Sequence, residues 1–478
     1  MNRHSQCKRP QCKRPQCKRP QSKRPQGNRP QCNRRDFIHA AGGAAALFST
    51  NVAVSQAASP PAGDKLKMGF IGLGGRGGAL LGGFLARDDC HVVALCDVHR
   101  DRLSKARDLV RTAQGEDPAT TADLHDVLGD RSIEAVVIAT PDHWHAPAAV
   151  YACQANKHIY VEKPISNNVA EGRRVVEAAR KYDRVVQSGM QNRSAPYNHK
   201  ARDYVQSGKL GKVILCRVYN QKTVGTLSTA EDSQPPELLD WDRWNGPCRR
   251  TAFNALRYEH WKQFWDYGGG EVTNDGVHQL DLACMVLGIE SLPKSVLTIG
   301  TRRVETAAET PDTVIATFEF DQFPMTFEQT LEAPYILKTD PGVRNGDLFP
   351  YWQQNATRIE IFGTKGVMFL GRHGGGWQVF SRPKSRQPVV VAQEFGRFPD
   401  PEHKEDFVQA IRLGRRPNSD IAHGHRSAAL CHLANISYRV GNRHLHIDPT
   451  TETINNDAEA NALLKVEYRE PYTIAQKL

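Results

Sequence analysis

The sequence predicts an α/β domain over residues 66–189, followed by an α+β domain with a largely antiparallel sheet over residues 190–478. Three observations lead to this prediction. Short apolar runs alternate with amphipathic segments up to about Gly189, a glycine-rich turn follows the first run, and strand-like segments later gather without intervening helices. The chain of 478 residues is also long enough for two domains that each bury a core.

The first domain is predicted to be a parallel sheet with helices on both faces. The expected strands are residues 68–72, 91–96, 135–139, 158–161 and 185–188. The expected helices are residues 76–87, a helix that ends near residue 113, and residues 122–128, 147–154 and 169–182. Because helices and strands alternate, each connection should cross over between parallel strands.

The second domain is predicted to be a sheet with helices packed against it. The expected strands are residues 213–221, 295–302, 312–319, 325–331, 358–362 and 377–381. The expected helices are residues 195–207, 271–287, 403–413 and 426–440. Consecutive strands without crossover helices are typical of antiparallel pairing.

The net charge of +11 is concentrated at the N-terminus. Residues 1–35 contain four Lys, eight Arg and no acid, in decaying copies of the pentapeptide Gln6-Cys7-Lys8-Arg9-Pro10. Removing these 12 from the 63 basic residues leaves 51 against 52 acidic ones, so residues 36–478 carry about −1. We expect residues 1–35 to be a disordered basic repeat, and we expect no nucleic-acid partner for the rest of the chain.

Residues 34–57 have the organisation of a twin-arginine signal peptide. Arg34-Arg35 precedes an apolar stretch rich in Ala and Gly, and Ser55-Gln56-Ala57 offers small residues for cleavage. The stretch is too short and too rich in glycine for a stable membrane-spanning helix. We expect twin-arginine export to the periplasm or secretion, a linker at 58–65, and no membrane anchor after cleavage.

The cysteines after residue 57 favour free thiols over a disulfide framework. They number seven, which is odd, and none forms a Cys-x-x-Cys pair. Cys96, Cys153, Cys284 and Cys431 lie in apolar surroundings that are typical of buried thiols. The mature chain is therefore expected to fold in a reducing compartment before export.

A dinucleotide site of the Rossmann type is predicted where the first strand meets the first helix. Gly72, Gly74 and Gly77 match Gly-x-Gly-x-x-Gly, which permits a tight turn, the approach of a pyrophosphate and close helix packing. Asp97 lies 20 residues beyond Gly77, where an acid can bond ribose hydroxyls and repel a 2′-phosphate. We expect NAD, although two nearby arginines keep NADP possible. The alternative is a structural turn in which Asp97 caps the next helix.

Two more segments follow strand ends at the same edge of the sheet. Thr140-Pro141-Asp142 follows the third expected strand, and Glu162-Lys163-Pro164 follows the fourth. Ligands of open α/β sheets bind outside the carboxyl ends of the strands, so both segments should lie over the cofactor. Lys163 is then placed to face a nicotinamide, with Thr140, Pro141 and Glu162 as further cofactor contacts. Asp142 could also cap the following helix.

These segments resemble the Gfo/Idh/MocA family of glucose–fructose oxidoreductase and inositol dehydrogenase types. The resemblance rests on the glycine motif, Ala139–Asp142, Glu162–Pro164, and Gly268–Gly270 leading into His278, and it spans about residues 65–445. The segment Trp241–Pro247 also resembles secreted bacterial members. The resemblance implies that Lys163 contacts substrate and nicotinamide, and that His278 is the acid/base.

The chain departs from the family pattern four residues before His278. Many members have Asp-x-x-x-His, but this position is Asn274, which can orient an imidazole and carries no charge. In a regular helix the offset of four would place Asn274 on the face of His278, and Asp275 would also be near. Asp275 or Asp281 could supply the missing carboxylate, or His278 could act with Lys163 alone.

Together these features predict an NAD(P)-dependent oxidoreductase that acts on a secondary alcohol of a sugar, polyol or sugar derivative. Such a reaction needs a base for the hydroxyl proton and a cofactor for the hydride. An exported member is expected to hold its cofactor tightly. The candidate substrate contacts are Arg193 and Tyr197, with Trp261, Trp265 and Tyr267 as further aromatics. Family analogy also implies a homo-oligomer formed through the exposed face of the antiparallel sheet.

Three alternatives are weighed against this prediction. A redox-neutral, NAD-dependent glycosidase or lyase-type enzyme would oxidise a sugar and reduce it again within one cycle. A non-catalytic sugar-binding member would be consistent with Asn274. A metal-dependent lyase using His143, His145 or His278 lacks a recognisable ligand spacing, so no metal is expected.

Overall fold

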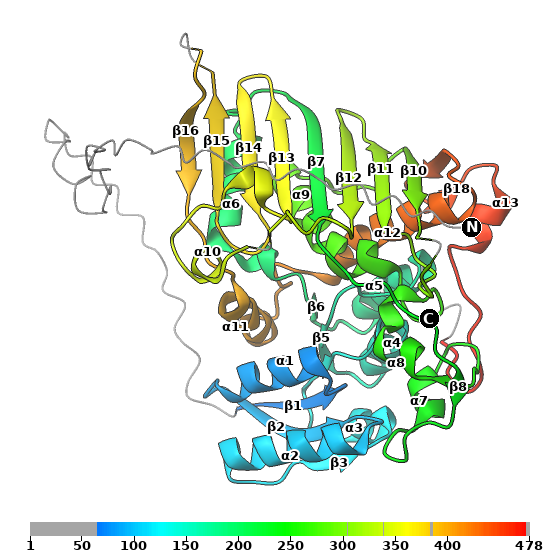
Figure 1. Ribbon diagram of the computed structural model, residues 1–478. Helices are drawn as coiled ribbons and strands as arrows, with labels where there is room; N and C mark the ends of the chain where they lie inside the picture. Colours follow the sequence, from blue (N-terminus) through cyan, green and yellow to red (C-terminus); the bar gives the residue numbers. More distant parts are fainter. Residues whose placement is uncertain (1–64, 304, 338, 383–385, 475–478) are drawn as a thin grey trace, which may run out of the picture. The chain divides into compact units, whose positions relative to one another are not determined.

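A computed structural model describes residues 65–303, 305–337, 339–382 and 386–474 (Figure 1). The expected basic repeat, the export signal and most of the linker at 58–65 lie outside the described residues. The described chain forms a six-stranded sheet, a ten-stranded sheet and a two-stranded ribbon. In this part of the chain no helix has both the length and the apolar character needed to cross a membrane.

The first sheet is parallel throughout, with the strand order β3-β2-β1-β4-β5-β6. Its strands are β1 (Leu66–Ile71), β2 (Cys90–Cys96), β3 (Ala119–Thr121), β4 (Ala135–Ile138), β5 (His158–Val161) and β6 (Val186–Ser188). The order reverses between β1 and β4, which opens a crevice at the carboxyl ends of these strands. The predicted Rossmann sheet is confirmed, and β3 is a strand that the sequence pattern did not predict.

Helices cover both faces of this sheet (Figure 1). One face packs against α1 (Gly75–Leu85), α2 (Arg100–Gln114) and α11 (Asp400–Arg412). The other face packs against α3 (Leu124–Gly129), α4 (Asp142–Gln154) and α5 (Val169–Lys181). Because both faces are covered, the inner strands β4 and β5 are mostly apolar and almost wholly buried, as is usual in parallel sheets.

The helix predicted over residues 147–154 begins five residues earlier, at Asp142. Pro141 precedes the first turn, and Asp142 lies within it, where a negative charge interacts favourably with the helix dipole. Pro147 was the first residue of the expected helix. It lies inside the helix instead, at the cost of one backbone hydrogen bond.

The second sheet has the order β16-β15-β14-β13-β7-β12-β11-β10-β17-β18. Neighbouring strands are antiparallel except for β12 and β7, so the predicted largely antiparallel sheet is confirmed. The predicted strands are β7 (Val213–Gln221), β10 (Ser295–Thr301), β11 (Thr313–Glu319), β12 (Pro324–Thr330), β13 (Arg358–Gly363) and β15 (Trp377–Ser381). The strands that were not predicted are β14 (Gly366–Gly371), β16 (Val389–Glu394), β17 (Leu445–Asp448) and β18 (Thr453–Ile454).

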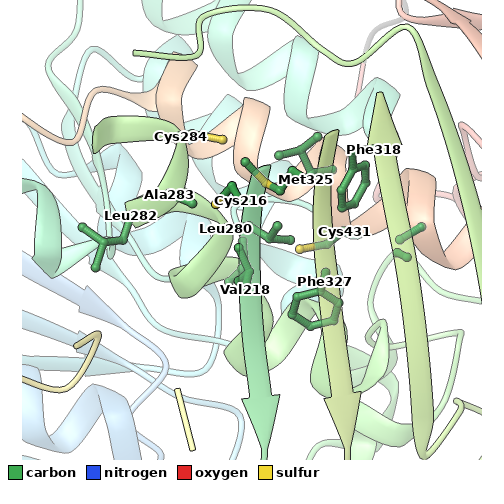
Figure 2. Close-up of a cluster of buried hydrophobic side chains, with 14 of the residues drawn as sticks. Cys216, Val218, Leu280, Leu282, Ala283, Cys284, Phe318, Met325, Phe327 and Cys431 are labelled. Atoms are coloured by element: carbon green, nitrogen blue, oxygen red, sulfur yellow. The ribbon is translucent and has the colours of Figure 1, made fainter. Parts of the chain in front are cut away.

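Three helices cover one face of the second sheet and close its core. They are α6 (Pro196–Gln206), α9 (Val277–Leu287) and α12 (Ile421–Arg439). Figure 2 shows side chains of β7 and β12, such as Val218 and Phe327, packed with Leu280 of α9 and Cys431 of α12. A π-helical turn, η3 (Val272–Gly276), leads directly into α9. This junction carries the residues Asn274 and Asp275.

Short elements complete the described chain. The helices are α7 (Trp241–Asn245), α8 (Ala255–Glu259), α10 (Pro341–Asn345), α13 (Ala458–Ala462), and the single turns η1 (Gln191–Ser194), η2 (Trp261–Gln263) and η4 (Trp352–Gln354). The two-stranded ribbon pairs β8 (Asp232–Ser233) with β9 (Phe253–Asn254). The cysteines of the described chain, seven in number, are all buried and free, and burial raises the pKa of Cys90 and Cys153 to about 12.

Helix α11 belongs to the core of the first sheet although it comes from late in the sequence. Phe407 packs edge-on against Phe84 and Tyr160, with ring centroids 6.3 and 5.9 Å apart. Its side chain is fully buried in the cluster that also contains Met68 and Phe70. The chain therefore returns to the Rossmann sheet after completing most of the second sheet.

Replacing Phe407 by Ala should destabilise the protein by about 3–5 kcal/mol, because it leaves a cavity beside the rings of Phe84 and Tyr160. Denaturant unfolding monitored by fluorescence would measure the loss. The control is Leu413→Ala at the end of the same helix, where the side chain is 56% exposed and the expected change is within about 0.5 kcal/mol. Equal effects of the two variants would show that α11 contributes little to this core.

Candidate active site

A cavity of about 1110 Å³ opens at the carboxyl ends of β1, β2, β4 and β5. Its walls include the glycine loop and the start of α4 on one side, and the π-turn and Arg372 on the other. This volume exceeds the roughly 300–1,000 Å³ of a typical small-molecule site. It therefore has room for a large cofactor together with a second, smaller molecule.

The glycine loop has the geometry that a bound pyrophosphate requires. Gly72 has φ +87°, a conformation that side chains rarely adopt, and a Cβ on Gly77 would lie 2.0 Å from the Gly72 carbonyl oxygen. Gly74 and Gly75 line the cavity, and α1 begins at Gly75. The free N–H groups of the first turn thus lie beside the cavity, where they can bind phosphate.

Asp97 links the glycine loop to the end of β2. Its two carboxylate oxygens accept hydrogen bonds from the backbone N–H groups of Leu73 (2.7 Å) and His99 (2.8 Å). The residue is buried but still lines the cavity, as a ribose-binding acid would. Arg102 also lines this end, with its guanidinium stacked on Tyr258. A positive charge near Asp97 is the feature that could admit a 2′-phosphate.

The segment after β4 presents an unsatisfied polar group to the cavity. Thr140 and Pro141 line the wall, and the buried Thr140 Oγ1 forms no hydrogen bond within the described part of the chain. Buried polar atoms usually have partners, so this hydroxyl fits a site that receives a ligand. Together with the glycine loop and Asp97, it makes the cavity consistent with a dinucleotide cofactor.

The two histidines of this segment have structural roles. The ring nitrogens of His145 lie 2.6 Å from the Pro164 carbonyl oxygen and 2.8 Å from that of Thr140. His143 Nε2 lies 2.9 Å from the Trp244 carbonyl oxygen. Burial lowers the pKa of both imidazoles. These contacts join neighbouring loops, and at His145 a neutral ring can donate to only one of the two carbonyl oxygens.

Glu162 positions an arginine at the start of α1. Its Oε1 accepts from Arg76 Nε at 2.7 Å, and Arg76 also pairs with Asp400 at 3.3 Å. Burial alone would raise the pKa of Glu162, but the charges of Arg76 and Lys163 hold it below its usual value. Glu162 lines the cavity, and its carboxylate accepts from Arg76, the Tyr160 hydroxyl and the Lys163 backbone N–H.

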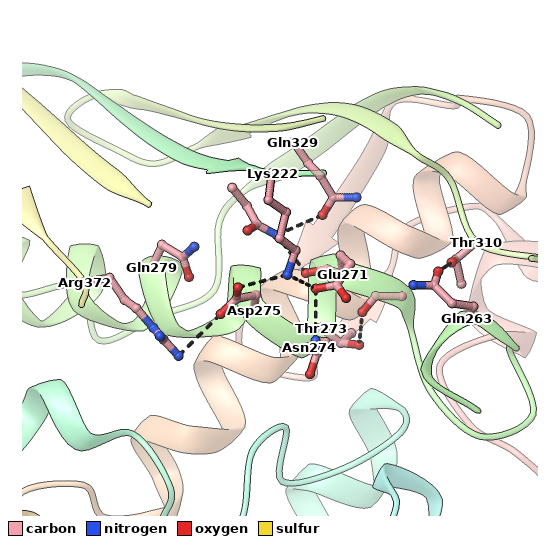
Figure 3. A network of polar contacts seen from close by, with 12 residues as sticks. Lys222, Gln263, Glu271, Thr273, Asn274, Asp275, Gln279, Thr310, Gln329 and Arg372 are labelled. Atoms are coloured by element: carbon pink, nitrogen blue, oxygen red, sulfur yellow. Dashed lines mark hydrogen bonds and ion pairs between the residues drawn. The ribbon is translucent and has the colours of Figure 1, made fainter. Parts of the chain in front are cut away.

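Lys163 connects the first sheet to the π-turn. Its Nζ donates to the Asn274 backbone oxygen (2.5 Å) and to Asn274 Oδ1 (3.0 Å). The Asn274 amide in turn donates to Glu271 at 3.0 Å (Figure 3). Burial lowers the pKa of Lys163. The lysine is thus held in place by neutral oxygens that do not stabilise its charge as a carboxylate would.

Asp142 is a cavity residue whose charge interacts with that of Lys163. Burial raises the pKa of its carboxyl group, and the positive charge of Lys163 opposes this shift. The two charges interact within the buried cavity, so protonation of one group affects the pKa of the other. Their titration therefore belongs to the pair. The sequence places the segment of Asp142 over the cofactor and offers a helix cap as its role, but Asp142 is not among the predicted site residues.

The π-turn changes the expected relation between Asn274 and His278. In a regular helix, residues four apart share a face, but the wider π-turn rotates later residues relative to earlier ones. Asn274 consequently bonds Lys163 and Glu271, not His278. Both residues line the cavity, but among the described residues no hydrogen bond joins the Asn274 side chain to the imidazole that it was expected to orient.

His278 lies in the cavity wall and is 4% exposed. The imidazole forms no hydrogen bond with any residue that the structure describes. Burial and the positive charges of Arg372 and Lys163 hold its pKa well below the usual value, and the negative charge of Asp275 acts in the opposite direction. His278 is therefore a neutral imidazole with free ring nitrogens beside the cavity.

The two aspartates considered as partners of His278 bond elsewhere. Asp275 pairs with Lys222 at 3.0 Å and Arg372 at 3.4 Å (Figure 3). Burial alone would raise its pKa, but these cations hold the pKa well below the usual range. Asp281 pairs with Arg193 at 2.8 Å. Asp275 thus acts on the imidazole through its charge, and Asp281 is committed to another pair.

The expected substrate contacts Arg193 and Tyr197 do not line the cavity. Arg193 is buried against Asp281, which the helical spacing alone did not reveal. The Tyr197 ring lies against Gly396, and its carbonyl oxygen accepts from Trp377 at 2.9 Å. Among the further aromatics, Trp261 lines the cavity but Trp265 and Tyr267 do not.

Several cavity residues that sequence reasoning missed come from the second half of the chain. They include Tyr258, Lys262, Arg344, Arg372 and Phe398. The one available signal was Arg372 in the glycine-rich segment Gly371–Gly376, where several glycines have positive φ. Such a turn can bring a side chain close to a ligand, but its distance in sequence from the Rossmann motifs hid the relation.

Comparisons with protein families identify the class to which the chain belongs. Residues 66–190 match the oxidoreductase family model with an NAD-binding Rossmann fold. Residues 198–369 match the GFO/IDH/MocA C-terminal domain, and residues 365–474 match the C-terminal alpha/beta domain of the oxidoreductase family. The three models together account for nearly all described residues. The chain belongs to the Gfo/Idh/MocA oxidoreductase family, and its cofactor class is NAD.

Individual relatives share parts of the chain. A glycosyl hydrolase family 109 protein of Shewanella baltica is 36% identical over 167 residues, which are 30% of this chain and 36% of that protein. Myo-inositol 2-dehydrogenase of Thermotoga maritima is 28% identical over 182 residues, which are 38% of this chain and 49% of that enzyme. The matches thus span less than half the length of either relative.

A solved structure shows the same fold over a longer stretch. Levoglucosan dehydrogenase, in complex with NADH and L-sorbose, has a TM-score of 0.58 and 18% identity, and the match covers 80% of this chain and 99% of that one. At this identity the likeness establishes the fold.

Replacing Asp97 by Ser should weaken NAD binding by about 10–100-fold and raise the NADP-to-NAD affinity ratio. The reason is that the carboxylate facing the ribose is lost while Arg102 remains. Calorimetric titration of cofactor-free protein would measure both constants. Asp97→Asn removes the charge but keeps an oxygen that can accept from one of the two backbone N–H groups. Comparing the two variants therefore separates the effect of the lost charge from the effect of the lost hydrogen bonds to the glycine loop. An unchanged ratio in both variants would contradict the assigned role.

Proposed function

We propose that the protein is an NAD(P)-dependent oxidoreductase that acts on a secondary alcohol of a sugar, polyol or sugar derivative. The observation that carries this proposal is the joint placement of Lys163 and His278 in the wall of one cavity, beside a glycine loop suited to a dinucleotide. The family membership supports the same class of reaction.

The chemistry follows from the state of the two side chains. A bound nicotinamide supplies the acceptor or donor of a hydride. His278 is neutral and has free ring nitrogens, so it can accept the hydroxyl proton as the alcohol is oxidised. Lys163 is fixed by Asn274 and can donate a hydrogen bond to the same oxygen. Asp142 is a further titratable group in the cavity, and its charge interacts with that of Lys163.

Asn274 supports retention of catalysis despite its difference from the family pattern. Its side-chain oxygen still accepts from Lys163, and its amide is anchored on Glu271. It therefore positions the lysine without adding a negative charge. The charge that the usual aspartate would supply is provided near Lys163 by Asp142 and near His278 by Asp275. This arrangement favours an enzyme over a binding protein that has lost its activity.

A redox-neutral glycosidase is the second candidate function. It is favoured by the similarity to the glycosyl hydrolase family 109 protein, which is 36% identical over 167 residues. In that cycle the same groups would oxidise a sugar hydroxyl, assist loss of the aglycone, and reverse the oxidation. Release of an aglycone from a glycoside without net formation of reduced nicotinamide would distinguish this cycle from a net oxidation.

We also propose that the protein is exported by the twin-arginine pathway and carries its cofactor with it. The proposal rests on Arg34-Arg35 and the following apolar stretch, which lie outside the described residues. Free NAD is scarce outside the cytoplasm, so a weakly held cofactor would be lost. Export of the folded, loaded protein explains both the signal and the free buried cysteines.

Replacing His278 by Asn or Lys163 by Met should lower turnover by about 100- to 10,000-fold, because each removes a proton-transfer group. Cofactor content should persist in His278→Asn. The assay follows reduced nicotinamide, and aglycone release in parallel, across neutral and acidic sugars, polyols and glycosides. His260→Asn and Lys105→Met are matched controls at exposed positions and should retain activity. Full activity of His278→Asn would contradict its role.

The pH dependence gives a further check on His278. The imidazole acts in its unprotonated form, and its lowered pKa keeps that form present at mildly acidic pH. The acid limb of kcat/KM should therefore fall below the ordinary histidine value of about 6.5. An acid limb above that value would show that the imidazole is charged in the free enzyme.

We infer a homo-oligomer formed through the uncovered face of the second sheet. The inference is supported by exposed apolar side chains, including Leu297, Ile299 and Ile315, on strands whose other face packs on helices. Ile299 and Ile315 are direct partners across β10 and β11. Light scattering after size exclusion should report an oligomer that Ile299→Lys reduces to a monomer. Leu348→Lys, at an exposed position outside this sheet, should leave it intact. A monomeric wild type would contradict the inference.

A further inference from the structure

Arg372 is a buried cation whose described contacts do not satisfy it. The residue is 8% exposed, and its one ion pair is a 3.4 Å contact with Asp275 Oδ1. Its Nε is buried without a hydrogen-bond partner in the described part of the chain. A guanidinium carries five N–H donors, and a buried one is usually paired and fully hydrogen-bonded. Because Arg372 also lines the cavity, a ligand there can supply the missing acceptors.

Arg344 presents a second guanidinium to the same cavity. It stacks on Phe398, with the guanidinium carbon 4.3 Å from the ring centroid, and its backbone oxygen accepts from Phe398 N at 2.8 Å. The Arg372 guanidinium carbon lies 5.9 Å from the same centroid. The two carbons are therefore at most 10.2 Å apart, the sum of these distances. Phe398 thus holds two arginines at one end of the cavity.

The charges around these arginines leave one positive charge uncompensated. Glu271 and Asp275 are balanced by Lys222 and Arg372, which they contact as ion pairs. Arg344 makes no ion pair with any acid among the described residues. A ligand with a single negative charge would complete the balance, whereas a dianionic phosphate ester would exceed it.

We propose that Arg344 and Arg372 bind a carboxylate of the substrate, so that the substrate is an acidic sugar of the uronic or aldonic class. The identity of the reacting group as an alcohol rests on the proposed function. The carboxylate site is inferred independently, from the two arginines. Planar guanidinium groups match the geometry of a carboxylate. The position next to Asp275 and His278 places the acid group in the same part of the cavity as the reacting alcohol.

A carboxylate at this place would also affect the base. Among the charged and titratable groups that act on His278, Arg372, Lys163 and His373 lower its pKa, and Asp275 raises it. A bound anion would offset the charge of Arg372. His278 would then be a stronger base in the complex with the acidic substrate than in the free protein.

Calorimetric titration of the purified protein with its cofactor tests the proposal without requiring turnover. The probes are matched sets: D-glucuronate, D-gluconate, D-glucose and D-glucose 6-phosphate, and D-galacturonate, D-galactonate, D-galactose and D-galactose 6-phosphate. The expected result is that a carboxylate member binds at least tenfold more tightly than its neutral and phosphorylated counterparts. The proposal is overturned if no carboxylate binds, or if the neutral or phosphorylated sugar binds equally well.

Variants assign the effect to the two arginines. Arg344→Gln, at a half-buried position, should weaken binding of the carboxylate at least tenfold and leave the neutral sugar unaffected. Arg372→Gln should do the same if it folds. The control is Arg397→Gln, which lines the neighbouring cleft and pairs with Glu402, and which should bind as the wild type does. Carboxylate binding that survives Arg344→Gln overturns the proposal.

The outcomes separate this site from the reaction. Arginine-dependent binding of a carboxylate sugar without any nicotinamide chemistry would leave the acid site standing and contradict the proposed function. Efficient oxidation of neutral sugars that is insensitive to Arg344→Gln would support the function and overturn the acid site.

Discussion

The hydrogen bonds from Lys163 to Asn274 are the contact on which the proposed site depends. They join the end of β5 in the first sheet to the π-turn that precedes α9 under the second sheet. The cofactor loop and His278 lie on opposite sides of this contact, so its geometry sets their separation. Because Asn274 offers oxygens without charge, the lysine is positioned while its ammonium form is stabilised less than beside a carboxylate.

Burial sets the chemistry of the surrounding groups. It lowers the pKa of His278 and Lys163 and raises that of Asp142, which favours the uncharged form of each group. Asp275 remains charged because Lys222 and Arg372 compensate for its burial. Lys222 and Arg372 are thus paired with an acid. Arg344 has no acid partner among the described residues, so its charge indicates an anionic ligand.

The sequence was most informative where local chemistry determines structure. The glycines of the Rossmann turn, Asp97 and Lys163 occupy the cavity edge that strand-end reasoning predicts. It was least informative where distant segments meet. Arg193 and Asp281 are 88 residues apart in the sequence, and Arg372 and Asp275 are also far apart, yet each pair is in contact. No motif near these residues in the sequence indicates either ion pair. The π-turn affected a different prediction. The expected position of Asn274 relative to His278 assumed the period of a regular α-helix, which the π-turn changes.

The most direct test uses protein recovered from the periplasm or medium of its native host, with no cofactor added. Sugars, polyols and sugar acids are supplied in turn while the absorbance band of reduced nicotinamide is followed, and the protein is then denatured. The account predicts that the band rises with at least one substrate and that denaturation releases roughly stoichiometric nicotinamide. Absence of bound nicotinamide, with no band even after NAD is added, would contradict the assignment of this cavity to alcohol oxidation.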